Sequence, residues 1–496
     1  LPEVVHRPEC LFDPDDLATA AARLQQALLD EPFRALLLAG ACEHAAAYRW
    51  ERSAGIALSA LQRLRSGFAR AKTPAAWTPS EAEVAVFADA LEAADPEIEH
   101  ALRQGLEAIA RRGRRRLLLD ITEVVRQDAR SGIQRVVRNY CASLAQLARS
   151  RPEFEIVPFT WQADEIVSAY SYVRTRLGVD IDGEDGIVEA QCGDLALMLD
   201  SSWWSPERFD VFHAQVKAAG GEVVWMVYDL VPINTPQLCD PVMPPVFRTW
   251  LQHVADRADG CVCISAATEA DLQRYFSAYL GREQTHPWTR VVHLGSDFDT
   301  GSAEPASEDV RNLIEQLQPA GYCVALSTIE PRKDYPTVLA AFEQLWAEGS
   351  ELALVIIGKQ GWNVDAFCES LRSHPEHGRR LQWLDRAGDG DVRALLAGAR
   401  CLIQASLAEG FGLAVVEAGS LGLPLLLSDI GVFREVAGDE ASYFPTGDAA
   451  ALAGLLRTAS ASGAWRRPEG IRTLSWADSA QGLLASLLGL PPGAGA

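Results

Sequence analysis

The chain has 496 residues, of which 48% are hydrophobic and 23% are charged, so it is long enough for two or three folded domains. Its formal net charge of -22 argues against nucleic acid as a main partner, because binding to phosphate backbones needs a basic surface. Its ten cysteines do not make a disulfide framework in so long a chain, and several lie in apolar runs, which favours the reducing cytoplasm.

The first 112 residues are predicted to form a helical accessory region. They are rich in alanine and leucine, and their periodicity over 17–29, 54–68 and 81–91 favours amphipathic helices. No group of chemically active residues stands out there, so we expect the region to mediate homo-oligomerisation or to dock a partner. No apolar run of about 18 residues and no signal-peptide pattern is found, so no transmembrane helix is expected.

An arginine-rich segment ends this region, with five arginines between positions 111 and 116. One interpretation is a solvated linker. The other is a patch for anionic lipid headgroups or a lipid diphosphate, which would hold a cytoplasmic protein at the inner face of the membrane.

From residue 117, short apolar runs alternate with helical stretches, which predicts two doubly wound α/β domains. Strands of a first sheet are expected at 117–119, 195–199, 223–227, 261–264 and 291–294. Strands of a second sheet are expected at 323–327, 352–357, 381–383, 401–404, 425–428 and 442–444.

These strands define the expected domain organisation. The two Rossmann-like domains cover residues 113–300 and 301–470, joined by a linker at 297–309, and a final helix and tail occupy 471–496. A ligand belongs in the cleft that the two domains face, at the carboxyl ends of the strands.

The segment that follows the apolar run 401–404 carries the most informative motif. Gly410 and Gly412 open a helix that bears Glu417. Backbone N–H groups and the positive end of a helix dipole can hold an anion at such a turn. Because Glu409 and Glu417 can accept hydrogen bonds from sugar hydroxyls, the segment predicts a site for a nucleotide-sugar.

Two further motifs follow strands of the second domain. The first, at 328–334, contains Glu330, Arg332 and Lys333, of which Arg332 can clamp phosphate oxygens as a fork while Lys333 acts as a point charge. The second is a glycine-rich strand exit that begins at Gly358. Taken alone, an Arg-Lys pair is usually a solvated surface feature, and the glycine-rich exit can be a simple tight turn.

Together the motifs resemble the GT4 glycosyltransferases of the GT-B fold, particularly the mannosyl- and related transferases that build bacterial surface polysaccharides. The signature of that family is a Glu, seven residues and a second Glu, which are Glu409 and Glu417 here. The resemblance spans roughly 115–490 and includes 263–265, 292–297 and 475–477, the last of which resembles the start of the helix that crosses back to the first domain. It implies a GT-B fold with an added N-terminal α-helical region.

The resemblance also implies roles for individual residues. Glu409 would contact the donor sugar and Glu417 the ribose, while Arg332, Lys333 and the Gly412 region would bind the donor diphosphate. The remaining donor-binding candidates are Gly132, Ser265, Glu330, Gly358, Gly410, Phe411 and Leu413.

Gly132 looks like the family's glycine loop, which approaches the donor phosphate from the opposite wall, where a close backbone approach favours glycine. Arg135 and Arg138 follow it on a predicted helix, and they either add positive charge to the site or face solvent.

The chain departs from the family's pattern at two positions. Many relatives carry His-Asp after the strand at 223–227, whereas this chain has Tyr228 and Asp229. Asp229 is therefore the candidate for contact with the acceptor hydroxyl or the transferring sugar. Ser327 stands where some members place another arginine, so neutralisation of the diphosphate depends more on Lys333 and Arg332.

The function implied is a retaining glycosyltransferase that moves a hexose from a nucleotide-sugar to a glycan or lipid-linked acceptor in surface polysaccharide biosynthesis. Mannose from GDP-mannose is favoured, although donor base, sugar and acceptor stay open. No Asp-x-Asp motif lies at a strand end with an obvious metal role, and arginine and lysine can replace a divalent ion. No metal and no cofactor beyond the donor are therefore expected.

Three alternatives are weighed against this function. One is a catalytically degenerate GT-B protein that acts as a scaffold, with the helical N-terminal region as its functional part. Another is a different GT-B enzyme, such as a nucleotide-sugar epimerase or a phosphorylase. An NAD-dependent oxidoreductase is disfavoured, because Val415 occupies the third glycine position of the dinucleotide-binding motif after Gly410 and Gly412.

Overall fold

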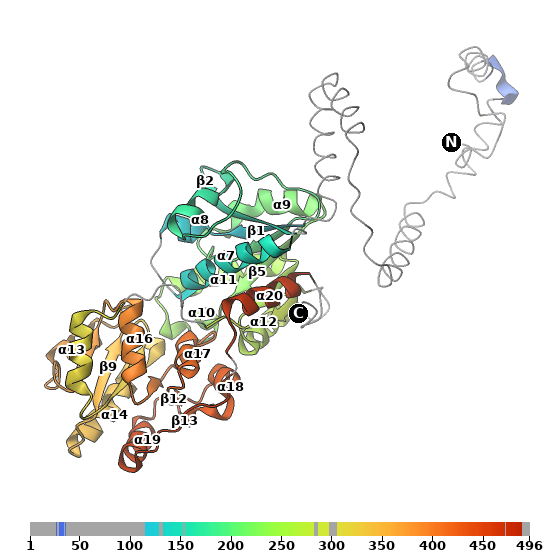
Figure 1. Cartoon of the computed structure of the whole chain (residues 1–496). Coiled ribbons are helices and arrows are strands. Elements are labelled where there is room, and N and C mark those ends of the chain that lie inside the picture. Colours follow the sequence, from blue (N-terminus) through green and yellow to red (C-terminus); the bar gives the residue numbers. More distant parts are fainter. Residues whose placement is uncertain are drawn as a thin grey trace. The chain divides into compact units, whose positions relative to one another are not determined.

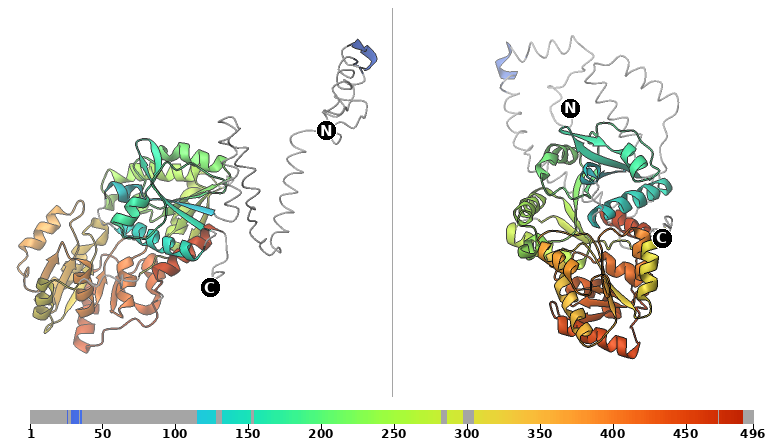
Figure 2. Two further views of the ribbon diagram at one scale, coloured as in Figure 1. Left: turned by 45° about the horizontal axis from the view of Figure 1, so that its top comes forward. Right: turned by 90° about the vertical axis from the view of Figure 1, so that its left-hand side faces the viewer.

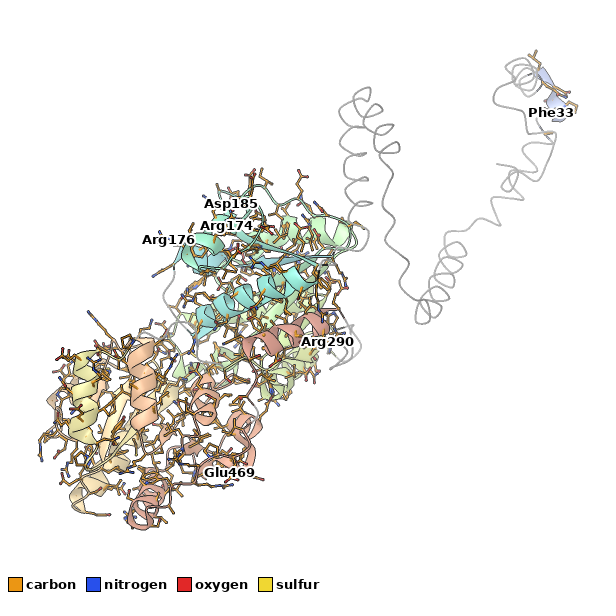
Figure 3. The ribbon with its side chains drawn as sticks, viewed as in Figure 1. Phe33, Arg174, Arg176, Asp185, Arg290 and Glu469 are labelled. Atoms are coloured by element: carbon orange, nitrogen blue, oxygen red, sulfur yellow. The ribbon has the colours of Figure 1, made fainter. Side chains whose placement is uncertain are left out.

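The computed structural model describes residues 26, 29–33, 35, 115–127, 132–151, 154–281, 286–296, 305–471 and 473–488. The chain separates into two units, residues 1–84 and 85–496. In the first unit the described residues are helical apart from Asp30, whose side chain accepts a hydrogen bond from the N–H of Phe33. Phe33 is labelled in Figure 3. Most of the helices predicted for 1–112 lie outside the described residues, as do the first three arginines of the arginine-rich segment.

A seven-stranded sheet forms the first lobe of the second unit (Figure 1). Its strands are β1 (Arg115–Asp120), β2 (Phe154–Gln162), β3 (Glu165–Ser168), β4 (Leu195–Met198), β5 (Glu222–Val227), β6 (Gly260–Cys263) and β7 (Trp288–Val291). Their order is β3-β2-β1-β4-β5-β6-β7, and all neighbours are parallel except the antiparallel pair β2 and β3. The five predicted strands are present, with β7 three residues earlier than expected, whereas β2 and β3 were not predicted.

Helices flank this sheet and bury their apolar faces on it. They are α6 (Thr122–Arg126), α7 (Gly132–Ser150), α8 (Tyr170–Arg176), α9 (Asp210–Ala218), α10 (Val231–Asn234), α11 (Met243–Arg257) and α12 (Ala266–Tyr279). The strands of the sheet centre are fully buried, which explains why they read as continuous apolar runs.

A six-stranded, fully parallel sheet forms the second lobe. Its strands are β8 (Tyr322–Leu326), β9 (Ala353–Ile357), β10 (Leu381–Leu384), β11 (Leu402–Gln404), β12 (Leu425–Ser428) and β13 (Ser442–Phe444), in the order β10-β9-β8-β11-β12-β13. All six match the predicted strands. The helices are α13 (Glu308–Leu317), α14 (Tyr335–Ala347), α15 (Asp365–Ser373), α16 (Asp389–Gly398), α17 (Leu413–Ser420), α18 (Gly431–Ala437) and α19 (Ala449–Ser462). Two hydrophobic clusters cover the sheet.

The last helix, α20 (Trp476–Leu487), follows the second lobe in the chain and packs on the first (Figure 2). Its Trp476 ring meets the ring of Tyr140 on α7 edge to face, with centroids 5.5 Å apart. The Ser479 hydroxyl lies 2.8 Å from the Tyr140 hydroxyl and donates to the His293 carbonyl. Arg290, labelled in Figure 3, donates to the Ser486 carbonyl.

Two α/β sheets in succession, the first mostly parallel and the second fully parallel, with a final helix that returns to the first, confirm the GT-B fold predicted from the sequence. Among the described helices, none combines the length and apolarity needed to cross a membrane. The last two arginines of the arginine-rich segment belong to β1. Arg116 is buried and donates from Nε to Asp194 at 2.8 Å, and Arg115 donates to the Gly193 carbonyl, so neither is a freely solvated linker residue.

Candidate active site

Glu409 lies at the centre of a buried ion cluster just beyond β11. Its Oε2 accepts a hydrogen bond from Arg332 Nη1 at 2.8 Å, and its Oε1 contacts Lys333 Nζ and the Ser406 hydroxyl. Burial favours the neutral carboxyl, but the charges of Lys333 and Arg332 outweigh it and lower the pKa of Glu409 to about 2. Glu409 is therefore ionised at neutral pH.

The two cations come from a single 3-10 turn, Pro331–Lys333, between β8 and α14. Arg332 also donates from Nε to Glu330 at 2.9 Å and from Nη1 to the Ala408 carbonyl at 3.2 Å. Burial and the neighbouring Arg332 lower the pKa of Lys333, while the Glu409 carboxylate opposes this shift. Arg332 and Lys333 thus face two carboxylates, and the cluster is close to electrically neutral.

The glycines of the 409–412 segment are required by close packing. A Cβ on Gly410 would lie 2.0 Å from the Tyr228 carbonyl oxygen, and Gly412 has a φ of 95°, which favours glycine. The Ser265 hydroxyl, at the start of α12, donates to the Gly410 carbonyl at 2.7 Å. This contact joins the first lobe to the loop that precedes α17.

Glu417 is 3% exposed on α17 and forms an ion pair with Arg135 of α7, at 2.6 Å between Nη2 and Oε1. Burial raises the pKa of Glu417, and the Arg135 charge opposes this shift. The sequence left Arg135 open between the site and solvent, and the structure brings it to Glu417. Gly132, which begins α7, has no heavy atom within 4 Å of where a Cβ would lie, so the described structure gives no steric reason for a glycine there.

The other donor-binding candidates pack around this cluster in different ways. Gly358 approaches the exit of β8 so closely that a Cβ would lie 1.8 Å from the Ser327 carbonyl oxygen, as a tight turn requires. Phe411 is buried, with its ring 5.5 Å from that of His293 in the first lobe. Leu413 begins α17 and is half-buried against the hydrophobic core of the first lobe.

A pocket of about 320 Å³ opens beside Glu409 and Asp229. Asp229 follows β5, and its Oδ1 accepts a hydrogen bond from the Val231 N–H at 3.0 Å. Burial raises the pKa of Asp229, while Arg332 opposes this shift. Polar groups of α10 and α12 also line the pocket, with Asn234 Nδ2 donating to Asp271 at 2.6 Å. The pocket therefore joins hydroxyl-binding groups of the first lobe to the carboxylate of the second.

A second polar cluster lies at the ends of β1 and β4, and the sequence analysis missed it. Asp120 is fully buried, and its Oδ1 accepts hydrogen bonds from the N–H and hydroxyl of Thr122. Burial and the nearby Asp200 raise the pKa of Asp120 to about 7. Arg208 donates to Glu123 at 3.0 Å beside this pair. Acidic residues directly after two predicted strands were the signal that could have revealed it.

Comparison with known proteins relates part of this chain to a described family. Residues 317–467 match the family model described as "Glycosyl transferases group 1". This segment is a group 1 glycosyltransferase domain. It contains Arg332, Lys333, Gly358, Glu409 and Glu417, whereas the candidates of the first lobe lie outside it.

Similarity to curated proteins extends beyond the group 1 domain. The chain is 32% identical over 510 residues to a serotype-specific mannosyltransferase WbdA of Escherichia coli, a match that covers all of this chain and 61% of that protein. It is 31% identical over 235 residues to an O-antigen chain mannosyltransferase B of Escherichia coli, covering 46% of this chain and 58% of the relative. The chain thus spans about three fifths of the length of the WbdA mannosyltransferase.

A solved structure is also similar, that of Anabaena Alr3699/HepE in complex with UDP and glucose. The TM-score is 0.49 and the identity 16%, over 76% of this chain and 100% of that one.

Proposed function

We propose that the chain is a retaining glycosyltransferase that moves a hexose, with mannose favoured, from a nucleotide-sugar to a glycan or lipid-linked acceptor in surface polysaccharide biosynthesis. The observation that carries the proposal is the buried cluster of Glu409 with Arg332 and Lys333 inside a group 1 glycosyltransferase domain. The two curated relatives described above are both named mannosyltransferases, which favours mannose and hence GDP-mannose as donor.

The two cations are suited to a leaving diphosphate. When the bond between the anomeric carbon and the diphosphate oxygen breaks, negative charge grows on that oxygen, and fixed cations in a buried site stabilise it. Among the described residues, the contacts of Arg332 involve Nε and Nη1, which leaves Nη2 to donate to phosphate oxygens. Because arginine and lysine supply this charge, we propose that transfer needs no metal ion.

The acidic residues have separate roles in this proposal. Glu409 orients the donor sugar, and Glu417 accepts hydrogen bonds from the ribose hydroxyls. Asp229 lines the pocket beside Glu409 and contacts the acceptor hydroxyl or the transferring sugar. The acceptor oxygen bonds to the anomeric carbon on the face that the diphosphate leaves, and its proton passes to the diphosphate, so the configuration is retained.

The domain roles follow from this assignment. We propose that 113–300 is the acceptor domain and 301–470 the donor domain, with 471–496 crossing back. A cytoplasmic location with peripheral contact at the inner face of the membrane stays a prediction, as does partner docking or oligomerisation through 1–112.

A two-stage experiment tests the function. Thermal shifts with GDP, UDP, dTDP and ADP identify the nucleotide, because a ligand at 100 times its Kd stabilises the fold by about 2.7 kcal/mol. Turnover of the matching sugar donors with a panel of oligosaccharide acceptors then measures transfer, and NMR of the product gives its anomeric configuration. We expect selective stabilisation by GDP and retained configuration with GDP-mannose. A pure chain that neither binds nor turns over any donor would instead support the degenerate scaffold.

A further inference from the structure

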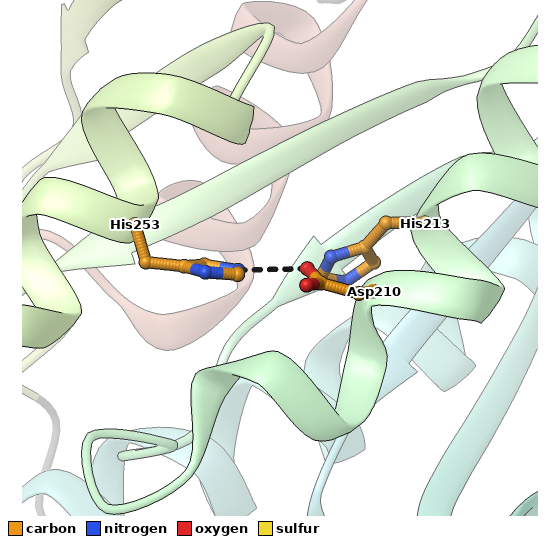
Figure 4. Close-up of side chains that lie close together, drawn as sticks. All are labelled: Asp210, His213 and His253. Atoms are coloured by element: carbon orange, nitrogen blue, oxygen red, sulfur yellow. Dashed lines mark ion pairs between the residues drawn. The ribbon is translucent and has the colours of Figure 1, made fainter.

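Three metal-binding side chains converge in the first lobe, on helices that carry none of the donor-site candidates. Asp210 and His213 lie one turn apart on α9, and His253 lies on α11. One ligand atom from each lies within 4.8 Å of the others. Figure 4 shows the three side chains meeting between the two helices.

The converging atoms have no hydrogen-bond partner among the described residues. Asp210 Oδ1, His213 Nδ1 and His253 Nε2 are each buried and unsatisfied. Asp210 Oδ1 and His253 Nε2 lie at an ion-pair distance of 3.3 Å, drawn as a dashed line in Figure 4, but they are not aligned as a hydrogen bond. Since an unsatisfied buried polar atom costs about 1–3 kcal/mol, three of them at one point indicate a missing ligand.

The surroundings hold His213 in an orientation suited to coordination. Its Nε2 lies 3.2 Å from the Met198 sulfur, so an Nε2–H directed at that sulfur leaves Nδ1 as a bare lone pair that points at the cluster. The residue is 3% exposed, so its ring is held away from bulk water. Phe209 stacks on it at 5.8 Å and Trp225 meets it edge-on, which fixes the ring.

We propose that Asp210, His213 and His253 bind a divalent transition metal ion, with zinc favoured, at a site that ties α9 to α11. Two imidazoles and one carboxylate are a ligand set typical of zinc, whereas magnesium and calcium prefer oxygen ligands. Bonds of about 2.0–2.1 Å in a tetrahedral site place ligand atoms about 3.4 Å apart. The Asp210–His253 pair already has that spacing, so small side-chain movements complete the site.

The fourth position is left to water. The Asp210 side chain is 35% exposed, so solvent reaches the cluster from its side. The main competitor is Arg257, whose Nη2 lies 3.9 Å from the other carboxylate oxygen of Asp210. That contact involves Oδ2 and leaves Asp210 Oδ1 for the metal. If no metal binds, Asp210, His253 and Arg257 form only an ion-pair network, which is the alternative outcome of the test.

Zinc binding to the metal-stripped chain is the direct test. Elemental analysis after zinc loading and removal of excess should give one ion per chain, and zinc should raise the melting temperature. His253→Ala should weaken the affinity more than about 100-fold, since losing an outer-shell partner already costs 10–100-fold. His374→Ala is the matched control, because His374 also pairs with a carboxylate, that of Glu343 at 3.2 Å, but has no third ligand among the described residues.

The absorption spectrum of the wild-type chain loaded with cobalt in place of zinc shows which kinds of side chain bind the metal. This measurement does not depend on whether His253→Ala folds. The chain holds ten cysteines, and among the eight in the described residues Cys192 is exposed, so thiolate binding must be separated. We expect visible d–d bands without a thiolate charge-transfer band, unchanged in Cys192→Ser. Absence of stoichiometric binding, a thiolate band, or full affinity in His253→Ala would overturn the proposal. Glycosyl transfer is measured separately and is expected to proceed without the metal.

Discussion

Asp120 is predicted to keep its proton up to a pH of about 7, well above the range in which a carboxyl normally ionises, and Asp120→Asn tests this. The carboxyl is fully buried, its Oδ1 accepts two hydrogen bonds from Thr122, and its Oδ2 has no partner among the described residues. Asp200 lies close enough to repel a second negative charge. An asparagine keeps the acceptor for Thr122 and can direct its amide N–H groups at Asp200, so the substitution mimics the protonated state without removing volume.

The magnitude follows from the pKa. Burial and Asp200 raise the pKa of Asp120 from 3.8 to about 7, so the folded state keeps the proton that the unfolded state releases. The contribution of this bound proton to the stability of the folded state is fully present below pH 3.8 and is lost as pH rises to about 7. Between pH 5 and pH 8 this loss covers about two pH units at 1.36 kcal/mol each, or about 3 kcal/mol. An amide does not titrate in this range, so the Asp120→Asn variant should gain about 2–3 kcal/mol relative to wild type between those pH values.

Urea unfolding at pH 5 and pH 8 measures the difference. Asp194→Asn is the matched control, because that aspartate is equally buried but is paired with Arg116. Losing the partner of a buried arginine should destabilise the chain at both pH values. If wild type and Asp120→Asn lose the same stability between pH 5 and pH 8, Asp120 is not the group that keeps the proton, which would refute the prediction.

Three predictions concern the donor site. Lys333→Ala should lower kcat about 10²–10³-fold with the fold intact, whereas Lys217→Ala should not change it; wild-type turnover would remove Lys333 from the mechanism. Activity should persist in excess EDTA, and a loss that Mg²⁺ or Mn²⁺ restores would contradict metal-independent transfer. Glu417→Gln should weaken GDP binding about 10–100-fold by calorimetry, because hydrogen bonds to charged groups contribute about 1.5–3 kcal/mol. An unchanged Kd would mean that Glu417 does not hold the ribose.

All six strands of the second sheet match predicted strands. The central strands β8, β9, β11 and β12 are almost entirely buried and read as apolar runs, whereas the edge strands β10 and β13 are only partly buried. The first sheet was harder. The strand β2 lies near the edge of the sheet and includes Glu155, Thr160 and Gln162, and β3 pairs antiparallel outside it, so neither reads as an apolar run. The continuous apolar run that identifies a central strand is therefore weak in strands at the edge of the sheet.

The candidate residues were visible in sequence because they share short motifs, but their partners were not. Glu417 and Arg135 come from different lobes, and no local spacing relates them. The same holds for the proposed metal site. The spacing of Asp210 and His213 shows two groups on one helix face, but His253 joins them only through the packing of α11. Tertiary contacts of this kind depend on the fold, so a single sequence predicts the groups and leaves their pairing open.

The charge balance around Glu409 suggests why this glutamate stands beside the two cations. Arg332 and Lys333 are adjacent, with side chains only 19% and 12% exposed, and each would repel the other without a carboxylate between them. Glu409 therefore holds both side chains in place before a donor binds. A diphosphate can take over contacts of the same kind, because it offers oxygens with the same preference for arginine and lysine. The carboxylate oxygens that this exchange releases are then free to accept hydrogen bonds from the hydroxyls of the donor sugar, so one residue would both preserve the empty site and recognise the sugar in the filled one.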